Sequence, residues 1–249
     1  MQNIPGSVAD RYGGWIKRFF AFIEEPVRVE EIRMSPPLLG TVGGVRAYYA
    51  ISMIGVEILF IGLSMGVFAI IDRKRDRTLS VILSSPIRSW ELFLADTLTA
   101  LAAIGISSLA ILLFSLLLGA EYHITPTTAA AVAGLLALSA VFTIGLGLLL
   151  AVAARSQESA MVIVNGVAFP VMFIGGIIIP PFVLPESLQR FASAYPLSRL
   201  VEAVRQLLVY EKTPGWALSY SLPAVAATIV VYALGFKIYN YLLAKTVEE

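Results

Sequence analysis

The chain has 249 residues, of which 58% are hydrophobic and 14% charged, and its formal net charge is +1. A soluble domain is usually about 45–50% apolar and about 25% charged, so this composition excludes an ordinary soluble domain and favours a membrane protein. The nearly neutral charge gives no sign of a nucleic-acid surface, and the lack of cysteine excludes disulfides and thiolate metal sites.

The N-terminal segment, residues 1–49, is mixed and polar. Within it, residues 11–23 (RYGGWIKRFFAFI) place their aromatic side chains on one helical face and their basic side chains off it. This pattern predicts an amphipathic helix that lies on a membrane surface or against another helix. We expect residues 1–49 to form a polar and amphipathic segment outside the cytoplasm, followed by a transmembrane domain over residues 50–249.

Five long apolar runs follow, each close to the roughly 20 residues that cross the hydrocarbon core of a bilayer. They predict an all-α membrane protein with transmembrane helices at residues 50–71, 92–120, 128–154, 160–179 and 216–241. Small residues inside the first and third runs, Gly62, Gly66, Gly145 and Gly147, predict close packing between helices.

The loop after the first run, residues 72–91, reads DRKRDRTLSVILSSPIRSWE. One interpretation is a charged stop followed by an interfacial stretch. The other is a short cytoplasmic helix whose apolar side chains insert into a cleft of a partner protein. The short loops at 72–91 and 155–159 carry six basic residues and the short loop at 120–127 carries none, which places the first two loops in the cytoplasm.

A second unusual segment precedes the last run. Pro185 and Pro196 stand where helices commonly begin, and they predict two short amphipathic helices. The second of these places Leu and Val on one side and Arg199, Glu202 and Arg205 on the other, which predicts a solvated, ion-paired face. Two short helices after a span broken by proline indicate a re-entrant or interfacial hairpin.

Polar side chains inside the runs are few. Glu57 lies seven residues into the first run, about 10 Å from its end at 1.5 Å per residue. A carboxylate in mid-bilayer costs about 2.5–3.5 kcal/mol, so it usually faces a partner or water. Glu57 is therefore a candidate for a translocation pathway or for a contact with a neighbouring helix. Asn165 allows the same two interpretations, and Asp96 lies near enough to the start of its run to be interfacial.

Residues for enzyme chemistry are missing from the sequence. It contains neither a P-loop nor an HExxH motif, and its only histidine, His123, lies in a short loop between two runs. One histidine without cysteine is a poor basis for a transition-metal site or a nucleophile–base pair. We therefore expect no catalytic residue, no metal site and no nucleotide site in this chain.

Two segments resemble the ATP-binding-cassette exporter type-2 permease family. The first, DRKRDRTLSVILSSPIRSWELFLAD, is similar to the family's charged stretch that includes its coupling helix. The second, GGIIIPPFVLPESLQRFASAYPLSRLVEAVRQLL at residues 175–208, is similar to the Pro-containing end of the family's fifth helix and its short re-entrant helices. The two matches and the spans between them extend over roughly residues 50–241.

The resemblance implies the membrane subunit of an ATP-driven exporter in the plasma membrane. It implies a second permease subunit, identical or related, and a separate cytoplasmic ATPase subunit that binds ATP and Mg²⁺. Coupling to that ATPase is assigned to Arg77, Thr78, Leu79, Ile82, Leu83, Ser84, Pro86 and Arg88, and the re-entrant hairpin to Pro185, Pro196, Arg199, Glu202 and Arg205.

The family usually has six spans, the first preceded by a cytoplasmic elbow helix. Residues 1–49 of this chain instead resemble the segment between the family's first and second helices. Either the chain lacks a helix because of a downstream start, or residues 10–23 serve differently; we expect an amphipathic segment and one further span to be encoded upstream of Met1.

A passive channel, or a scaffold subunit without an ATPase, is the alternative from another class. A channel should show a polar stripe along its pore, whereas the runs hold only isolated Glu57, Asp96 and Asn165. A secondary transporter should show inverted repeats and more buried ionisable groups, and neither is visible.

Overall fold

A computed structural model of the chain describes residues 41–75 and 87–248. The amphipathic helix predicted at residues 11–23 and most of the predicted coupling segment lie outside these residues. The described ranges contain α-helices and one 3₁₀ helix, and no strand. The elements are α2 (Val42–Arg75), α4 (Ser89–Leu117), α5 (Pro126–Ala151), α6 (Gln157–Ile174), η1 (Pro181–Val183), α7 (Glu186–Ala194), α8 (Pro196–Leu208) and α9 (Pro214–Glu248).

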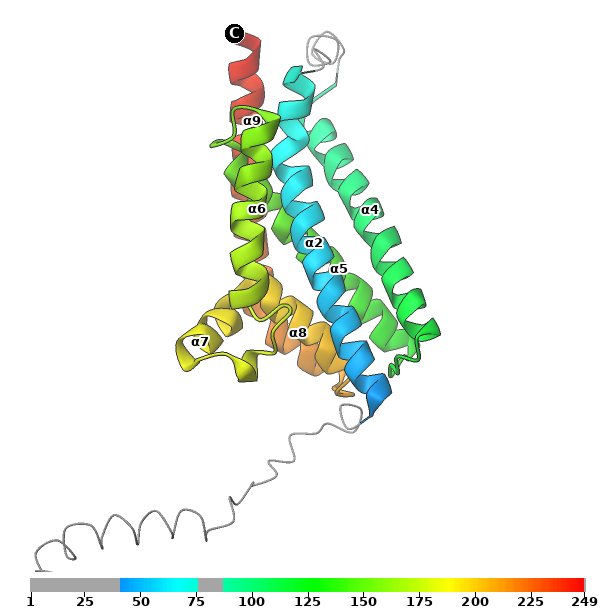
Figure 1. Ribbon diagram of the computed structural model, residues 1–249. Helices are drawn as coiled ribbons and strands as arrows, with labels where there is room; N and C mark the ends of the chain where they lie inside the picture. Colours follow the sequence, from blue (N-terminus) through cyan, green and yellow to red (C-terminus); the bar gives the residue numbers. More distant parts are fainter. Residues whose placement is uncertain (1–40, 76–86, 249) are drawn as a thin grey trace, which may run out of the picture. The chain divides into compact units, whose positions relative to one another are not determined.

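Five of these helices are long and apolar enough to cross a membrane, which confirms the predicted all-α protein with five spans. The spans are Val42–Ala69, Ser89–Leu117, Pro126–Ala151, Gln157–Ile174 and Pro214–Ala244. They run alternately in opposite directions (Figure 1), so the loops after α2 and after α5 lie at the same end. The Gln157 side chain at the start of α6 donates to Asp72 Oδ1 near the end of α2, at 2.7 Å.

The first span begins at Val42, earlier than the predicted start at Ala50. The first turns of the helix have a low hydropathy because they contain Gly43, Gly44 and Arg46. The apolar run in the sequence therefore does not include them. The structure stabilises the helix there through a tertiary contact, because Arg46 Nη1 donates to the carbonyl of Leu118 at 2.7 Å.

Helix α5 lies against both α2 and α9, and glycines allow the close approach. A Cβ atom added at Gly66 of α2 would lie 2.7 Å from Leu148 N and 2.8 Å from Gly147 Cα of α5. On the other side of α5, a Cβ at Gly145 would lie 3.0 Å from Tyr232 Cα of α9. These distances confirm the close helix packing predicted from the small residues.

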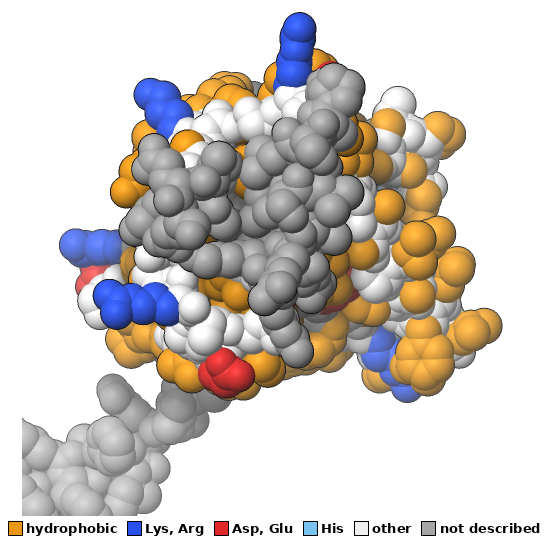
Figure 2. Space-filling view, turned by 90° about the horizontal axis from the view of Figure 1, so that it is seen from above, with side chains coloured by type: hydrophobic (Ala, Val, Ile, Leu, Met, Phe, Trp, Pro, Cys, Tyr) orange, Lys and Arg blue, Asp and Glu red, His pale blue; other side chains and the backbone are white. Residues whose placement is uncertain are grey.

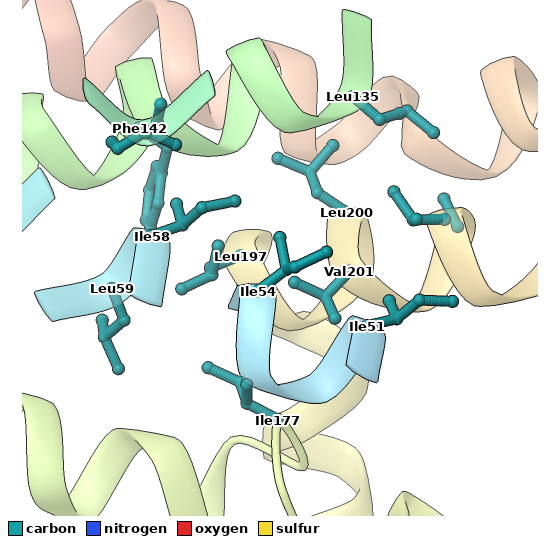
Figure 3. Packing of buried hydrophobic residues seen from close by; sticks show 14 of the residues in the cluster. Ile51, Ile54, Ile58, Leu59, Leu135, Phe142, Ile177, Leu197, Leu200 and Val201 are labelled. Carbon is teal, nitrogen blue, oxygen red and sulfur yellow. The ribbon is translucent and has the colours of Figure 1, made fainter. Parts of the chain in front are cut away.

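The largest group of buried apolar side chains lies where α2, α5 and α8 meet (Figure 3). Ile54 and Ile58 of α2 point toward Leu197 and Leu200 of α8, and Ile177 closes the group from the turn that follows α6. The Leu and Val side chains predicted on one side of the second short helix are all buried here: Leu197, Leu200, Val201, Val204, Leu207 and Leu208.

Helix α4 is buried mainly on one face. Its first turns pack on α9 through Phe93, whose ring lies 4.8 Å from that of Tyr232 and 5.4 Å from that of Tyr239. The buried Tyr239 hydroxyl donates to Asp96 Oδ2 at 3.0 Å, so Asp96 joins α4 to α9. The other face of α4 exposes large apolar side chains suited to lipid, among them Leu94, Leu98, Ile106, Leu109 and Leu113.

Seen from the end that holds the loop after α2, Lys and Arg side chains stand around the rim while hydrophobic side chains cover the sides (Figure 2). This distribution matches a protein whose sides face hydrocarbon and whose ends face water.

Candidate functional site

The side of α2 that faces away from α5 carries the candidate site. Successive residues of an α-helix are rotated by about 100°, so Gly66 and Phe68 point in nearly opposite directions. We call the side opposite the glycines the outer face of α2. Its residues are Glu57, Ile61, Ser64, Met65, Phe68 and Asp72.

Glu57 lies at the start of this outer face, next to α4. The Ser107 hydroxyl of α4 donates to Glu57 Oε1, and Ser108 Oγ donates to Oε2 at 3.4 Å. The same Ser107 hydroxyl lies 2.7 Å from the carbonyl oxygen of Ala103. Because a hydroxyl has one proton, Ser107 divides it among these two acceptors and the carbonyl oxygen of Ile104, which lies 3.4 Å away.

Glu57 lies farther from the ends of its span than its place in the apolar run predicted. It follows Val42, the first residue of the span, by 15 residues and precedes Ala69, the last, by 12. At 1.5 Å per residue this is roughly 18 Å from the nearer end instead of about 10 Å. The side chain is half-buried.

Beyond Glu57, the outer face of α2 is hollowed. The hollow has a volume of about 370 Å³, and the described residues that line it are Phe60, Ile61, Ser64, Met65, Phe68 and Asp72. Asp72 lies at the end of the helix, where its side chain is exposed and accepts a hydrogen bond from Gln157. A carboxylate therefore lies at each end of a largely apolar surface.

Asn165, the other residue predicted for a pathway, lies half-buried on α6. One turn further along α6, Phe169 meets Phe60 of α2 edge to face, with ring centroids 5.4 Å apart. The structure therefore brings Asn165 and Glu57 onto neighbouring helices. Glu57 itself makes its hydrogen bonds to α4.

A second cavity, of about 460 Å³, lies between α4 and α5. Ser108, the hydrogen-bond partner of Glu57, is one of its few polar lining residues. The rest of the lining is nearly all aliphatic, including Leu101, Ile104, Leu109, Leu112, Val132 and Leu136.

At the opposite end from Asp72, Arg205 of α8 forms a buried polar centre. Its guanidinium is fully enclosed and donates to Glu202 Oε2 at 3.1 Å and to Ser52 Oγ at 2.9 Å. It also donates to the carbonyls of Gly176, at 3.4 Å, and Ile177. We call this group the Arg205 centre.

The ring of Tyr48 completes the Arg205 centre, with the guanidinium carbon 4.3 Å from the ring centroid. Tyr48 and Ser52 belong to α2, and Gly176 lies in the turn after α6. One side chain of α8 thus joins three parts of the chain. Charged hydrogen bonds of this kind are about twice as strong as neutral ones.

The prediction that Arg205 lies on a solvated face of the second short helix is therefore wrong. The predicted ion pair with Glu202 exists, but it points inward because the turn after α6 leaves backbone carbonyls that need donors. Gly176 adopts φ +72°, a left-handed conformation that suits glycine and ends α6. In the sequence, the pair Gly175-Gly176 is the feature that could have indicated this turn.

Arg199, also predicted on the solvated face, binds the last helix instead. Its Nε donates to the carbonyl of Tyr220 at 2.6 Å, and its guanidinium lies 4.4 Å from the centre of the Tyr220 ring. Pro185 immediately precedes α7 and Pro196 is the first residue of α8, as the helix-start pattern predicted.

Of the predicted coupling residues, only Arg88 belongs to the described part of the chain. It caps the N-terminus of α4, where its backbone N–H donates to Glu91 Oε2 at 2.9 Å. Arg77, Thr78, Leu79, Ile82, Leu83, Ser84 and Pro86 lie outside the described residues.

Comparison with protein families gives one match, to the family described as ABC-2 family transporter protein, over residues 28–237. This range includes α2 to α8 and most of α9. The chain belongs to the ABC-2 transporter family. No curated protein and no solved structure matches it. Family and spans together establish a multi-pass membrane transport protein.

Within residues 41–75 and 87–248, no three His, Cys, Asp or Glu side chains lie close enough together to bind a metal ion. The arrangement offers two carboxylates along a membrane helix and a buried cation that fixes one end of that helix. Such a site can bind and orient a solute, and its chemistry is that of transport.

Proposed function

We propose that this chain is the permease subunit of an ATP-driven exporter in the plasma membrane. The observation that supports it best is the ABC-2 family match, which extends over four of the five spans and most of the fifth. In this proposal a separate cytoplasmic subunit binds ATP and Mg²⁺, and a second permease subunit, identical or related, completes the pathway.

Coupling is assigned to residues 72–88, which join α2 to α4. Asp72 at the end of α2 also accepts a hydrogen bond from Gln157 of α6. A partner that moves this loop would therefore act on α2, α4 and α6 together. Movement of the ATPase would shift the balance between two arrangements of the spans, each open to one side of the membrane.

The pathway is assigned to the outer face of α2, with Glu57 as its deepest charged group and Asn165 on the neighbouring α6. The hairpin of α7 and α8 would enter the bilayer from the opposite end as a re-entrant element. Its Arg205 centre satisfies backbone carbonyls that would otherwise lack donors at membrane depth.

The substitution Leu83→Glu tests the coupling. A carboxylate placed against an apolar cleft of the ATPase remains unpaired, so we expect loss of the ATPase on co-purification and loss of ATP-dependent transport in proteoliposomes. Ile124→Glu is the matched control, because Ile124 is an exposed apolar residue in the loop at the other end. Full ATP-driven transport by Leu83→Glu would refute the coupling, and flux without ATP in the wild type would favour a channel.

Orientation is tested with single cysteines, which are easily introduced because the chain has none. We expect Ser84→Cys to react with an impermeant thiol reagent only in inside-out vesicles, and Thr127→Cys only from the outside of intact cells. The reverse labelling would overturn the orientation taken from the charges of the short loops.

A further inference from the structure

We propose that the outer face of α2 selects an apolar organic cation, and that Glu57 binds its positive charge. This inference rests on the proposed pathway and names the class of its cargo. The evidence is the depth of Glu57, the weak compensation of its charge, and the aromatic hollow that continues from it toward Asp72.

Among the acidic and basic residues of the described spans, Glu57 lies farthest from the ends of its own span. Asp96 follows the start of its span by 7 residues and Lys237 precedes the end of its span by 7, against 12 for Glu57. Helix α5, which packs behind α2, contains no charged residue. Within the described ranges, no Lys, Arg or His side chain forms an ion pair with Glu57.

The two serine hydroxyls compensate the carboxylate only partly. Ser107 shares its one proton with the carbonyl of Ala103, and the hydrogen bond from Ser108 is long, at 3.4 Å. A carboxylate in mid-membrane without a matched cation is costly. Since Glu57 is half-buried and not enclosed, a charged ligand can reach it and supply the missing positive charge.

The neighbouring hollow fits the apolar part of such a ligand. Phe60 and Phe68 offer aromatic rings, whose faces attract cations, and Met65 offers a polarizable thioether. Ser64 is the only uncharged polar residue among the described lining. The hollow thus favours an apolar body over a sugar or a peptide.

Between residues 47 and 71 of α2, Glu57 is the only charged residue. Asp72 lies 15 residues from Glu57, roughly 22 Å along the helix at 1.5 Å per residue. Asp72 is followed directly by Arg73, Lys74 and Arg75, so the discrimination lies at Glu57, where an anion would meet a carboxylate and a cation would be attracted. Charge complementarity therefore selects the cation from among apolar solutes of the same size.

Tetraphenylphosphonium and tetraphenylborate test this, because they have nearly the same shape and opposite charges. The full chain is placed in phosphatidylcholine nanodiscs, and binding is measured against empty nanodiscs. We expect saturable binding of tetraphenylphosphonium and none of tetraphenylborate. Glu57→Gln should weaken the binding about tenfold or more, as expected for loss of one partner of a partly buried charge pair.

Two further variants keep the test decisive. Glu186→Gln removes an exposed carboxylate on α7 and should leave binding unchanged. Ser108→Ala leaves the carboxylate in place and should change the affinity much less than Glu57→Gln. The thermal unfolding temperature of each variant shows whether it remains folded.

Three outcomes would overturn the inference: no saturable tetraphenylphosphonium binding by the wild type, equal binding by folded Glu57→Gln, or saturable tetraphenylborate binding. The first would leave Glu57 as a proton-carrying or structural group. Binding in nanodiscs needs neither ATP nor the ATPase. Failure here is therefore distinct from failure of the exporter proposal, which the Leu83→Glu experiment tests.

Discussion

Helix α2 is held in two different ways along its length. In its middle, Gly66 lets the backbone of α5 approach directly and Gly62 makes room for the Thr143 side chain, so the contact depends on close packing. Near its start, Tyr48 and Ser52 meet the guanidinium of Arg205, and the contact is polar and directional. Both regions of α2 are buried, one through close packing and the other through directed hydrogen bonds.

The difference reflects what each contact must do in a bilayer. Lipid is as apolar as leucine, so helices in hydrocarbon associate through close van der Waals packing, which small residues permit. Such packing depends on shape and has no preferred hydrogen-bond direction. The Arg205 centre instead fixes the position of α8 and of the turn after α6 relative to α2, because Nη1 and Nη2 each donate to two acceptors in fixed directions.

The largest effect is expected at the Arg205 centre. Arg205→Met leaves two carbonyls, Ser52 and Glu202 without their buried donor, so we expect a loss of about 3–5 kcal/mol in the free energy of unfolding. Arg190→Met is the control, because Arg190 forms an exposed pair with Glu186 on α7 and should cost about 0.5 kcal/mol or less. Chemical unfolding in detergent measures both, and equal losses would refute the buried role.

A smaller loss is expected at the glycine contact. Gly66→Ala places a methyl group 2.7 Å from a backbone nitrogen of α5, so α2 and α5 must move apart. We expect this to lower the free energy of unfolding by about 1–3 kcal/mol. Gly134→Ala on α5 should leave stability unchanged or raise it, because a Cβ there meets no atom of the described residues within 4 Å and alanine favours the helix. Thermal unfolding compares the pair, and the same sign for both changes would contradict the close approach.

A third change tests the hydrogen bond that joins α4 to α9. Tyr239→Phe removes the hydroxyl that donates to Asp96, so we expect a loss of about 1.5 kcal/mol, the size of a hydrogen bond to a charged group. Tyr241→Phe, two residues along α9 and exposed, should have almost no effect. A cost at Tyr241 as large as at Tyr239 would show that the hydrogen bond is not the cause.

The smallest effect at neutral pH is expected for Tyr195→Phe. The Tyr195 hydroxyl is buried and has no hydrogen-bond partner within the part of the chain that the structure describes, so removing it should change stability little or raise it slightly. Burial raises the pKa of Tyr195 above its usual value of 10.0. The unfolded chain therefore loses this proton first, and the protein should lose stability as pH rises above about 10.

Unfolding measured from pH 8 to 11 tests this pH dependence. The wild type should lose stability over the range, and Tyr195→Phe should lose less. Equal slopes for the two proteins would show that other groups, such as Tyr210, whose pKa burial also raises, account for the pH dependence.

Much of the fold could be predicted from the sequence. The lengths of the apolar runs predicted five spans, the prolines predicted where α7 and α8 begin, and the small residues predicted close packing between helices. These features are local, or depend on the bilayer, which imposes the same length on every span. The start of α2 was missed because Gly43, Gly44 and Arg46 do not look like membrane residues.

The candidate site could be predicted only in part. The sequence alone determined that Glu57 is an isolated carboxylate in an apolar run and that Arg205 follows Glu202 at helical spacing. Only the tertiary structure decided that Glu57 lies in mid-span beside two serines of α4, and that Arg205 points inward. The physical reason is that the environment of a polar side chain depends on its hydrogen-bond partners. Here those partners come from other helices, tens of residues away in the sequence.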